Sequence, residues 1–337
     1  MTDLMKPTFL APKDHLKQGY LVKGTYLSTP LESIPKDIPL PYPVYVSVAK
    51  NMVLFRSKGD TLLQQRADKL LEKVDTLYIK SEDWIQFLSD LENTVEGVDL
   101  AKDPEAAGQH IRNLFYAYGK HLEHSRELQK TFYEKLQSLS EKLASCMTFK
   151  PTAAAKLIKR FNDPTLYISN HSVNVAIFSA LVAQKFGWNK ERLSRILLAG
   201  FIHNIGLIKI PEELVNKVGA LTPEEWNTVK THPELGAEIL TAIGASADII
   251  RTCREHHEQP DGKGYPKGLK EQEIGEYVSF IGVADVYDAL LSTRPWEQAY
   301  IPELAIEMMQ EMKGRFNPKI FQALGKRDLI RPQIFIS

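Results

Sequence analysis

The sequence predicts a chain in two parts: a small α+β domain at the N-terminus and an all-α helical bundle at the C-terminus, joined by a long connecting helix. Three observations carry this prediction. Apolar residues alternate along PVYVSVA (43–49), which is strand periodicity. Over about 105–147 they recur at steps of three and four, which is helical periodicity. From about 151 onward, helical patterns follow one another until QIFIS at the C-terminus.

The N-terminal part, residues 1–95, mixes strand and helix signals. MVLFR (52–56) and TLYIK (76–80) are two further β-rich runs, and GDTLLQQRADKLLEKV (59–74) between them has leucines at helical spacing. A short helix over 81–92 follows, with Ser81 as its expected cap. Because the part contains no nucleophile, metal cluster or phosphate loop, we expect a sensory or partner-binding role for it.

Residues 96–150 combine a linker with the long helix expected at 105–147. Its apolar seam consists of Leu114, Tyr118, Leu122, Ser125, Leu128, Phe132, Leu136, Leu139 and Leu143. Such a seam can form a coiled coil between two subunits, which would make the protein a homodimer. It can equally pack onto the domain that follows, because two of its positions are not strongly apolar.

The C-terminal part, residues 151–337, is expected to be helical throughout. Helices are predicted at 151–162, 166–186, 190–203, 222–243, 245–256, 273–290, 301–312 and 317–324. The clearest start signal is TPEEW, in which Thr222 caps, Pro223 takes the first helical position and Glu225 completes a capping box.

Charge and composition exclude several classes of function. The 337 residues include 42 Lys and Arg against 42 Asp and Glu, so no overall field favours a nucleic-acid polymer. No apolar run approaches the roughly 20 residues that span a bilayer, and the N-terminus lacks the pattern of a secretory signal. The two cysteines form no CxxC and are expected to be buried thiols. We therefore expect a cytoplasmic protein.

Histidines provide the strongest functional signal. Five of the nine, His171, His203, His232, His256 and His257, fall within 87 residues of the helical part. A lone buried histidine is usually structural, and an HH pair by itself is typical of a solvated helix end. Five on successive helices, together with Asp285, are better explained by a metal site, because helical bundles build such sites from facing helices. The HH pair opens HHEQPDGKGYP (256–266), whose glycines and proline predict a tight loop.

The order and spacing of four motifs resemble the HD-GYP family of bacterial metal-dependent phosphodiesterases. These motifs are HNIGLIKIP (203–211), KTHPELGAEIL (230–240), REHHEQPDGKGYPKGL (254–269) and ADVYDALLSTRP (284–295). The resemblance covers about 166–300 and implies an HD-type helical bundle acting on cyclic di-GMP.

The resemblance also implies roles for individual residues. One divalent metal would be held by His171, His203 and Asp285, and a second by His232, His256 and His257. Iron or manganese is the foremost expectation, and zinc or nickel also suits these ligands. Gly264, Tyr265 and Arg294 would lie at the substrate, and the Tyr265 loop would also contact partner proteins.

The chain departs from the family pattern at several positions. The Asp that bridges both metals in the family is Asn204 here, and a neutral amide compensates two cations less than a carboxylate does. The family lysine is Leu207, so Lys209 is the nearest substitute for a catalytic cation. Glu297 stands in a segment that is basic in the family, and Tyr167 replaces the Glu of a third metal site, so at most two metals are expected.

Three hypotheses follow. The protein is a degenerate HD-GYP signalling module that binds metal and a cyclic dinucleotide with weakened hydrolysis, which the combined departures favour. Alternatively it is an active cyclic di-GMP phosphodiesterase, which the six retained ligands favour. The third hypothesis, a helical interaction domain with an empty pocket, explains the clustered histidines least well.

Overall fold

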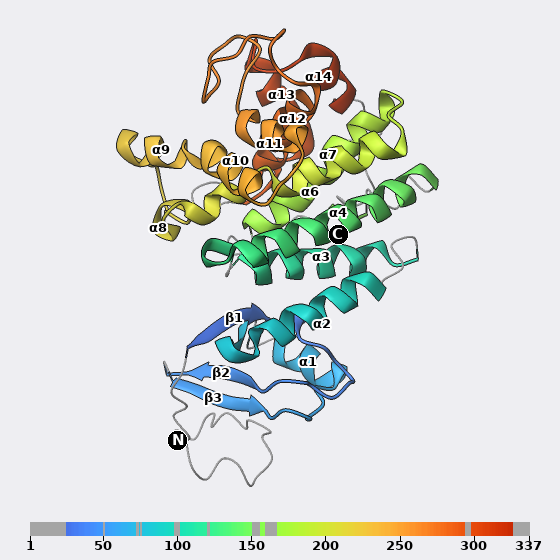
Figure 1. The fold of residues 1–337 in the computed structure, drawn as a ribbon, viewed down its shortest axis with the longest axis vertical. Helices are drawn as coiled ribbons and strands as arrows, with labels where there is room; N and C mark the ends of the chain where they lie inside the picture. Colours follow the sequence, from blue (N-terminus) through green and yellow to red (C-terminus); the bar gives the residue numbers. More distant parts are fainter. Residues whose placement is uncertain are drawn as a thin grey trace, which may run out of the picture. The chain divides into compact units, whose positions relative to one another are not determined.

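A computed structural model describes residues 25–49, 51–71, 74, 76–97, 102–119, 122–149, 156–158, 167–293 and 298–325 (Figure 1). Its contacts divide the chain into two compact units, residues 1–93 and 94–337. The first unit contains a small sheet and the second is helical, in agreement with the predicted fold class.

The first unit is built on a four-stranded antiparallel sheet of order β1-β4-β2-β3. The strands are β1 (Tyr26–Pro30), β2 (Val44–Val48), β3 (Asn51–Arg56) and β4 (Thr76–Lys80), joined by the short helix η1 (Leu31–Ser33) and by α1 (Gln64–Leu71). The 3-10 turn η2 (Ser81–Asp83) leads into α2 (Trp84–Gly97). Leu77 and Ile79 alternate inward along β4, and Phe87 of α2 is buried in the same unit. The sequence patterns had indicated three of these strands and missed β1.

The connecting segment differs from the single helix predicted at 105–147. It forms α3 (Pro104–Gly119), the turn η3 (Leu122–His124) and α4 (Arg126–Phe149). The two helices touch where they meet, because the Phe132 ring stacks on Tyr118 at 4.8 Å between centroids. The periodicity continued across this break, so it concealed the turn.

The seam residues of α3 and α4 are largely buried within one chain. Leu114, Tyr118, Leu136 and Leu143 are 2 % exposed or less. Helix α4 packs on α7 (Lys190–Ile202), and α3 packs on α6 (Tyr167–Lys185). These contacts follow the second interpretation of the seam, packing onto the domain that follows.

Helices α6, α7 and α12 (Glu276–Leu291) form the centre of the helical unit, where α6 packs against both of the others (Figure 1). Nearly every residue of α6 from Ser169 to Ala183 is buried. A helix that is buried on all sides is expected at the core of a bundle, and its polar side chains then need partners. For His171 and Asn174, these partners include Asp288 of the candidate site.

Around this centre lie η5 (Ile205–Lys209), α8 (Glu212–Val215), α9 (Pro223–Val229), α10 (His232–Ala242), α11 (Ala247–Glu255), α13 (Pro302–Glu311) and α14 (Pro318–Leu324). The capping box of α9 is present as predicted. The helix predicted over 222–243 is broken at 230–231, because Pro233 has no N–H to continue a helix and instead occupies its first turn. The break places His232 at the start of α10.

Some predicted features lie outside the described residues. Arg294 and Glu297 are among them, as are the side chain of Tyr167 and the terminal QIFIS run. Of the helix expected at 151–162, only 156–158 are described, and they form a turn. Among the helices that the structure describes, none is long and apolar enough to cross a membrane.

Candidate metal centre

Six side chains from five segments converge inside the helical unit. They fall into two groups of three whose candidate ligand atoms lie within 4.8 Å of one another: His171, His203 and Asp285, and His232, His256 and His257. The two groups adjoin, since the His203 and His256 rings lie 5.0 Å apart. The division into these two sets is the one that the family resemblance implied.

Backbone carbonyls fix the orientation of three rings. The Nδ1 atoms of His203, His232 and His256 lie 2.7, 2.8 and 2.7 Å from the carbonyl oxygens of Gly200, Val229 and Cys253, three residues earlier in each case. A carbonyl only accepts, so each Nδ1 carries the proton and each Nε2 keeps its lone pair. This is the arrangement of metal-binding histidines, whose second nitrogen donates to a carbonyl or carboxylate.

His171 is held by two carboxylates instead. Its Nδ1 donates to Asp288 Oδ2 at 2.9 Å, and its Nε2 lies 3.0 Å from Asp285 Oδ1. Burial alone would lower the pKa of His171, but the hydrogen bonds to Asp285 and Asp288 raise it to about 9. Burial would raise the pKa of Asp285, yet its bond to His171 and the neighbouring rings hold it well below the usual range. Asp285 is therefore ionised, and without a bound metal the His171 ring beside it carries a positive charge.

The other rings are neutral because they are buried. Burial lowers the pKa of His203 and of His232 to about 4, and that of His257 to about 3. His203 Nε2 is buried and lacks a hydrogen-bond partner among the described residues. A lone pair without a partner at the centre of a histidine cluster fits a divalent cation, which would repay its desolvation. The residues present therefore fit the metal that the sequence implies.

The loop after the HH pair is anchored on Glu258. Its carboxylate accepts from the backbone N–H groups of Lys267 and Leu269 at 2.6 and 2.8 Å. Gly264, within this loop, packs so closely on the loop's first residues that a β-carbon would overlap the backbone of residues 257–259. Tyr265 follows and stacks on the His257 ring at 4.7 Å. Both predicted loop residues therefore adjoin a candidate ligand.

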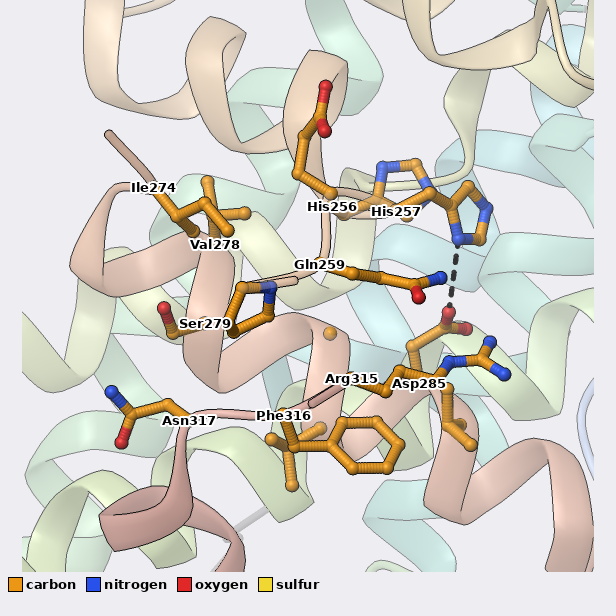
Figure 2. A pocket seen from close by; sticks show the side chains of 15 residues that line it. His256, His257, Gln259, Ile274, Val278, Ser279, Asp285, Arg315, Phe316 and Asn317 are labelled. Atoms are coloured by element: carbon orange, nitrogen blue, oxygen red, sulfur yellow. Dashed lines mark ion pairs between the residues drawn. The ribbon is translucent and has the colours of Figure 1, made fainter. Parts of the chain in front are cut away.

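One hollow is lined by candidate ligands, and a larger one is lined by Ser172 and Asn204, the sequence neighbours of His171 and His203. A pocket of about 20 Å³, lined by His256, His257, Asp285 and Arg315, is large enough for roughly one water molecule (Figure 2). A cavity of about 420 Å³ lies between the α3–α4 pair on one side and α6, α7 and η5 on the other, and Asn204 is among the residues that line it. That volume is within the range of small-molecule sites.

Asn204 and Lys209, both expected at the centre, differ in their placement. Asn204 directly follows His203 and also lines the larger cavity, and among the described residues its carboxamide makes no hydrogen bond to the six side chains, so its role as a bridging ligand stays a prediction. Lys209 is exposed, and its ammonium donates to the carbonyl of Glu123 at 2.7 Å. The expectation that Lys209 substitutes for the family lysine is therefore wrong in this structure, because the turn η5 directs it toward the α3–α4 pair.

Sequence reasoning missed two polar residues at the centre. Asp288 orients His171, and its position three residues after Asp285, nearly one helical turn on, was a signal that could have found it. Arg315 lines the small pocket, and its positive charge helps to lower the pKa of His257. It follows α13, far from the four motifs, so spacing offered no indication of it.

Comparison with known proteins identifies related sequences. Residues 153–320 match the HD domain family. The chain is 33% identical over 195 residues to the cyclic di-GMP phosphodiesterase PA4108 of Pseudomonas aeruginosa, covering 58% of this chain and 47% of that protein. It is 37% identical over 151 residues to the cyclic di-GMP phosphodiesterase response regulator RpfG of Xanthomonas campestris pv. campestris, covering 43% and 39%. The chain thus spans less than half the length of these relatives.

A solved structure has a similar fold. Bd1817, a HDG"Y"P protein from Bdellovibrio bacteriovorus, superimposes with a TM-score of 0.67 at 21% identity. The match covers 89% of this chain and 98% of Bd1817, so the likeness in fold extends beyond the residues that match the HD domain family.

Proposed function

Because this chain belongs, through residues 153–320, to the HD-GYP family of HD-domain proteins, we propose that it binds two divalent metal ions and a cyclic dinucleotide, with hydrolysis weakened at Asn204. The observation that carries the proposal is the buried pair of ligand groups with their Nε2 lone pairs turned inward. Cyclic di-GMP is the first ligand to test, because the two relatives described above are named for it.

Divalent ions bound by these residues would polarise a phosphodiester oxygen and activate water. The chain's own contribution is to hold three neutral rings on one side and two rings with one carboxylate on the other. Iron or manganese suits both sets, and zinc or nickel remains an alternative.

Arg315 supports a role for phosphate at this site. Its guanidinium lines the small pocket with Asp285 and His257 (Figure 2). A guanidinium is the preferred partner of a phosphate oxygen, and here it supplies the positive charge that Leu207 and the misplaced Lys209 do not. We propose that Arg315 contacts the scissile phosphate. The small pocket is too small for a dinucleotide, so the rest of the ligand would occupy its mouth or the larger cavity beside Asn204.

Weak hydrolysis is proposed because of the neutral amide at 204. A carboxylate would add a negative charge between two cations, and its loss is expected to cost several kcal/mol of transition-state stabilisation, roughly 10²-fold in rate. The second candidate, a fully active phosphodiesterase, is favoured by the six ligands that the chain retains. Protein contacts through the Tyr265 loop and dimer formation remain further proposals.

The test compares the full chain with Asn204→Asp, anaerobically, for metal content and cyclic di-GMP turnover. We expect both to bind metal and Asn204→Asp to turn over about 10²-fold faster. The matched control is Asn189→Asp, the same chemical change at the exposed cap of α7, where Asp caps as well as Asn. Rapid turnover by the unchanged chain would favour the active enzyme. Absence of bound metal would favour the interaction domain.

A further inference from the structure

We propose that Arg112, Asn174 and Asp288 form a positioning chain through which helix α3 holds His171 in the orientation that the first ligand group requires. The inference rests on the proposed metal binding at that group. It concerns residues that are not ligands and that belong to three different helices: α3, α6 and α12.

The contacts run without interruption from α3 to the ligand group. Arg112 donates to the backbone carbonyl of Leu157 and, at 3.3 Å, to Asn174 Oδ1. Asn174 Nδ2 donates to Asp288 Oδ1 at 2.9 Å, and Asp288 Oδ2 accepts from His171 Nδ1 at 2.9 Å. Arg112, Asn174, Asp288 and His171 are each 3 % exposed or less. Water therefore does not compete for these bonds.

The donors and acceptors in this series of hydrogen bonds determine which atom of each side chain carries the shared hydrogen. A guanidinium only donates, so the Asn174 oxygen must face Arg112 and its NH2 must face Asp288. Asp288 Oδ2 accepts the hydrogen bond that the His171 Nδ1–H donates. The His171 ring is thereby oriented with its Nε2 toward Asp285 of the first ligand group, as metal-binding histidines require. Arg112 thereby favours the orientation of the Asn174 amide in which the NH2 faces Asp288.

Arg112 is an unusual residue for this place. Burial lowers its pKa to about 9, although the negative charge of Asp288 acts in the opposite sense. It therefore remains charged at neutral pH. Burying a guanidinium costs several kcal/mol unless it is paired, and an apolar residue would fill the same space between α3 and α6 at no such cost. A role in orienting Asn174 explains why a charged residue is buried between α3 and α6.

Helix α3 also leaves room for the guanidinium. Gly108 lies one turn before Arg112, and a β-carbon there would come within 2.8 Å of Arg112 Nη1 and 3.3 Å of the Leu157 carbonyl. Glycine inside a helix is destabilising relative to alanine. The missing side chain is explained if the placement of Arg112 matters. Both residues precede the region that matches the HD domain family, so the connecting segment supplies this support.

The experiment measures the Mn²⁺ affinity of the 337-residue chain in two backgrounds that each leave one ligand group intact. His232→Ala leaves the first group and His203→Ala leaves the second. In the first background, Arg112→Gln and Arg112→Lys should each weaken Mn²⁺ binding about 10- to 100-fold, and Gly108→Ala should weaken it in the same direction. In the second background, the same changes should leave the affinity within about twofold. The matched control is Asn113→Ala, a buried polar neighbour on α3 outside the chain of contacts.

The outcomes separate the inference from the proposed function. Equal weakening in both backgrounds, or equal weakening by Asn113→Ala, would mean a general loosening of the fold and would overturn the inference. Unchanged affinity in both would overturn it as well. If neither background binds Mn²⁺ before Arg112 is changed, the proposed function itself fails. Should the Arg112 variants not fold, as judged by circular dichroism, Gly108→Ala decides the question, because it displaces the guanidinium without removing charge.

Discussion

Acidification should destabilise the metal-free protein through its buried neutral histidines. The pKa of His203 and of His232 is about 4 in the folded chain, against an ordinary value of 6.5. Between these values the unfolded chain binds a proton that the folded chain does not, so stability falls as the pH falls. A pH of 5 is about 1.5 units below the pKa of each ring in the unfolded chain. Each ring therefore lowers the free energy of unfolding by about 2 kcal/mol at that pH.

The two rings together predict a loss of about 4 kcal/mol between pH 7 and pH 5, a large part of a typical folding free energy. His171 acts in the opposite sense, because its pKa is raised to about 9 and its contribution is complete only below pH 6.5. Over the same window that gain is less than about 1 kcal/mol, so it does not change the sign. The lowered pKa values of His256 and His257 add to the loss.

The measurement is urea unfolding in the presence of a chelator at pH 7, 6 and 5. A companion variant, His232→Gln, replaces one ring by a side chain that cannot take up a proton, and its loss should be about 2 kcal/mol smaller. A folding free energy that does not change between pH 7 and pH 5 would refute the reasoning. So would an equal fall in the parent and the variant, because the rings would then not be buried and neutral.

Two further predictions concern the loop after the HH pair. Gly264→Ala should lower the free energy of unfolding by about 1–3 kcal/mol, because a β-carbon would overlap the backbone of residues 257–259. The control Gly119→Ala, with open space around the added carbon, should have little effect. Chemical unfolding of both variants checks this. Glu258→Ala removes the acceptor of two backbone N–H groups and should cost about 1–3 kcal/mol. Limited proteolysis should then cut near 263–269 faster than in the parent, and unchanged cleavage would contradict the anchoring role.

Sequence patterns predicted the fold class, and the family resemblance predicted the grouping of the six side chains. Periodicity predicted most helices of the C-terminal part, because apolar residues at 3.6-residue spacing indicate a helix whichever element packs against it. The HHEQPDGKGYP segment was distinctive because adjacent imidazoles and closely packed glycines are hard to explain without a cation and a tight loop. The six residues that resemblance assigned to two metals are the ones that the structure gathers into two groups of three, with the candidate ligand atoms of each group within 4.8 Å of one another.

The positions of the turns and the groups that support the ligands follow from the folded structure and not from sequence patterns. The helical pattern ran unbroken through residues 105–147, yet the chain turns at η3, because periodicity reports which side is apolar and not whether the backbone continues. Lys209 was chosen by its distance in sequence, and the turn η5 directs it elsewhere. Arg112 lies 59 residues before His171, and Asp288 lies 117 after it, so no local pattern joins them. Support of a ligand is a matter of distance in space, which the order of residues along a chain does not specify.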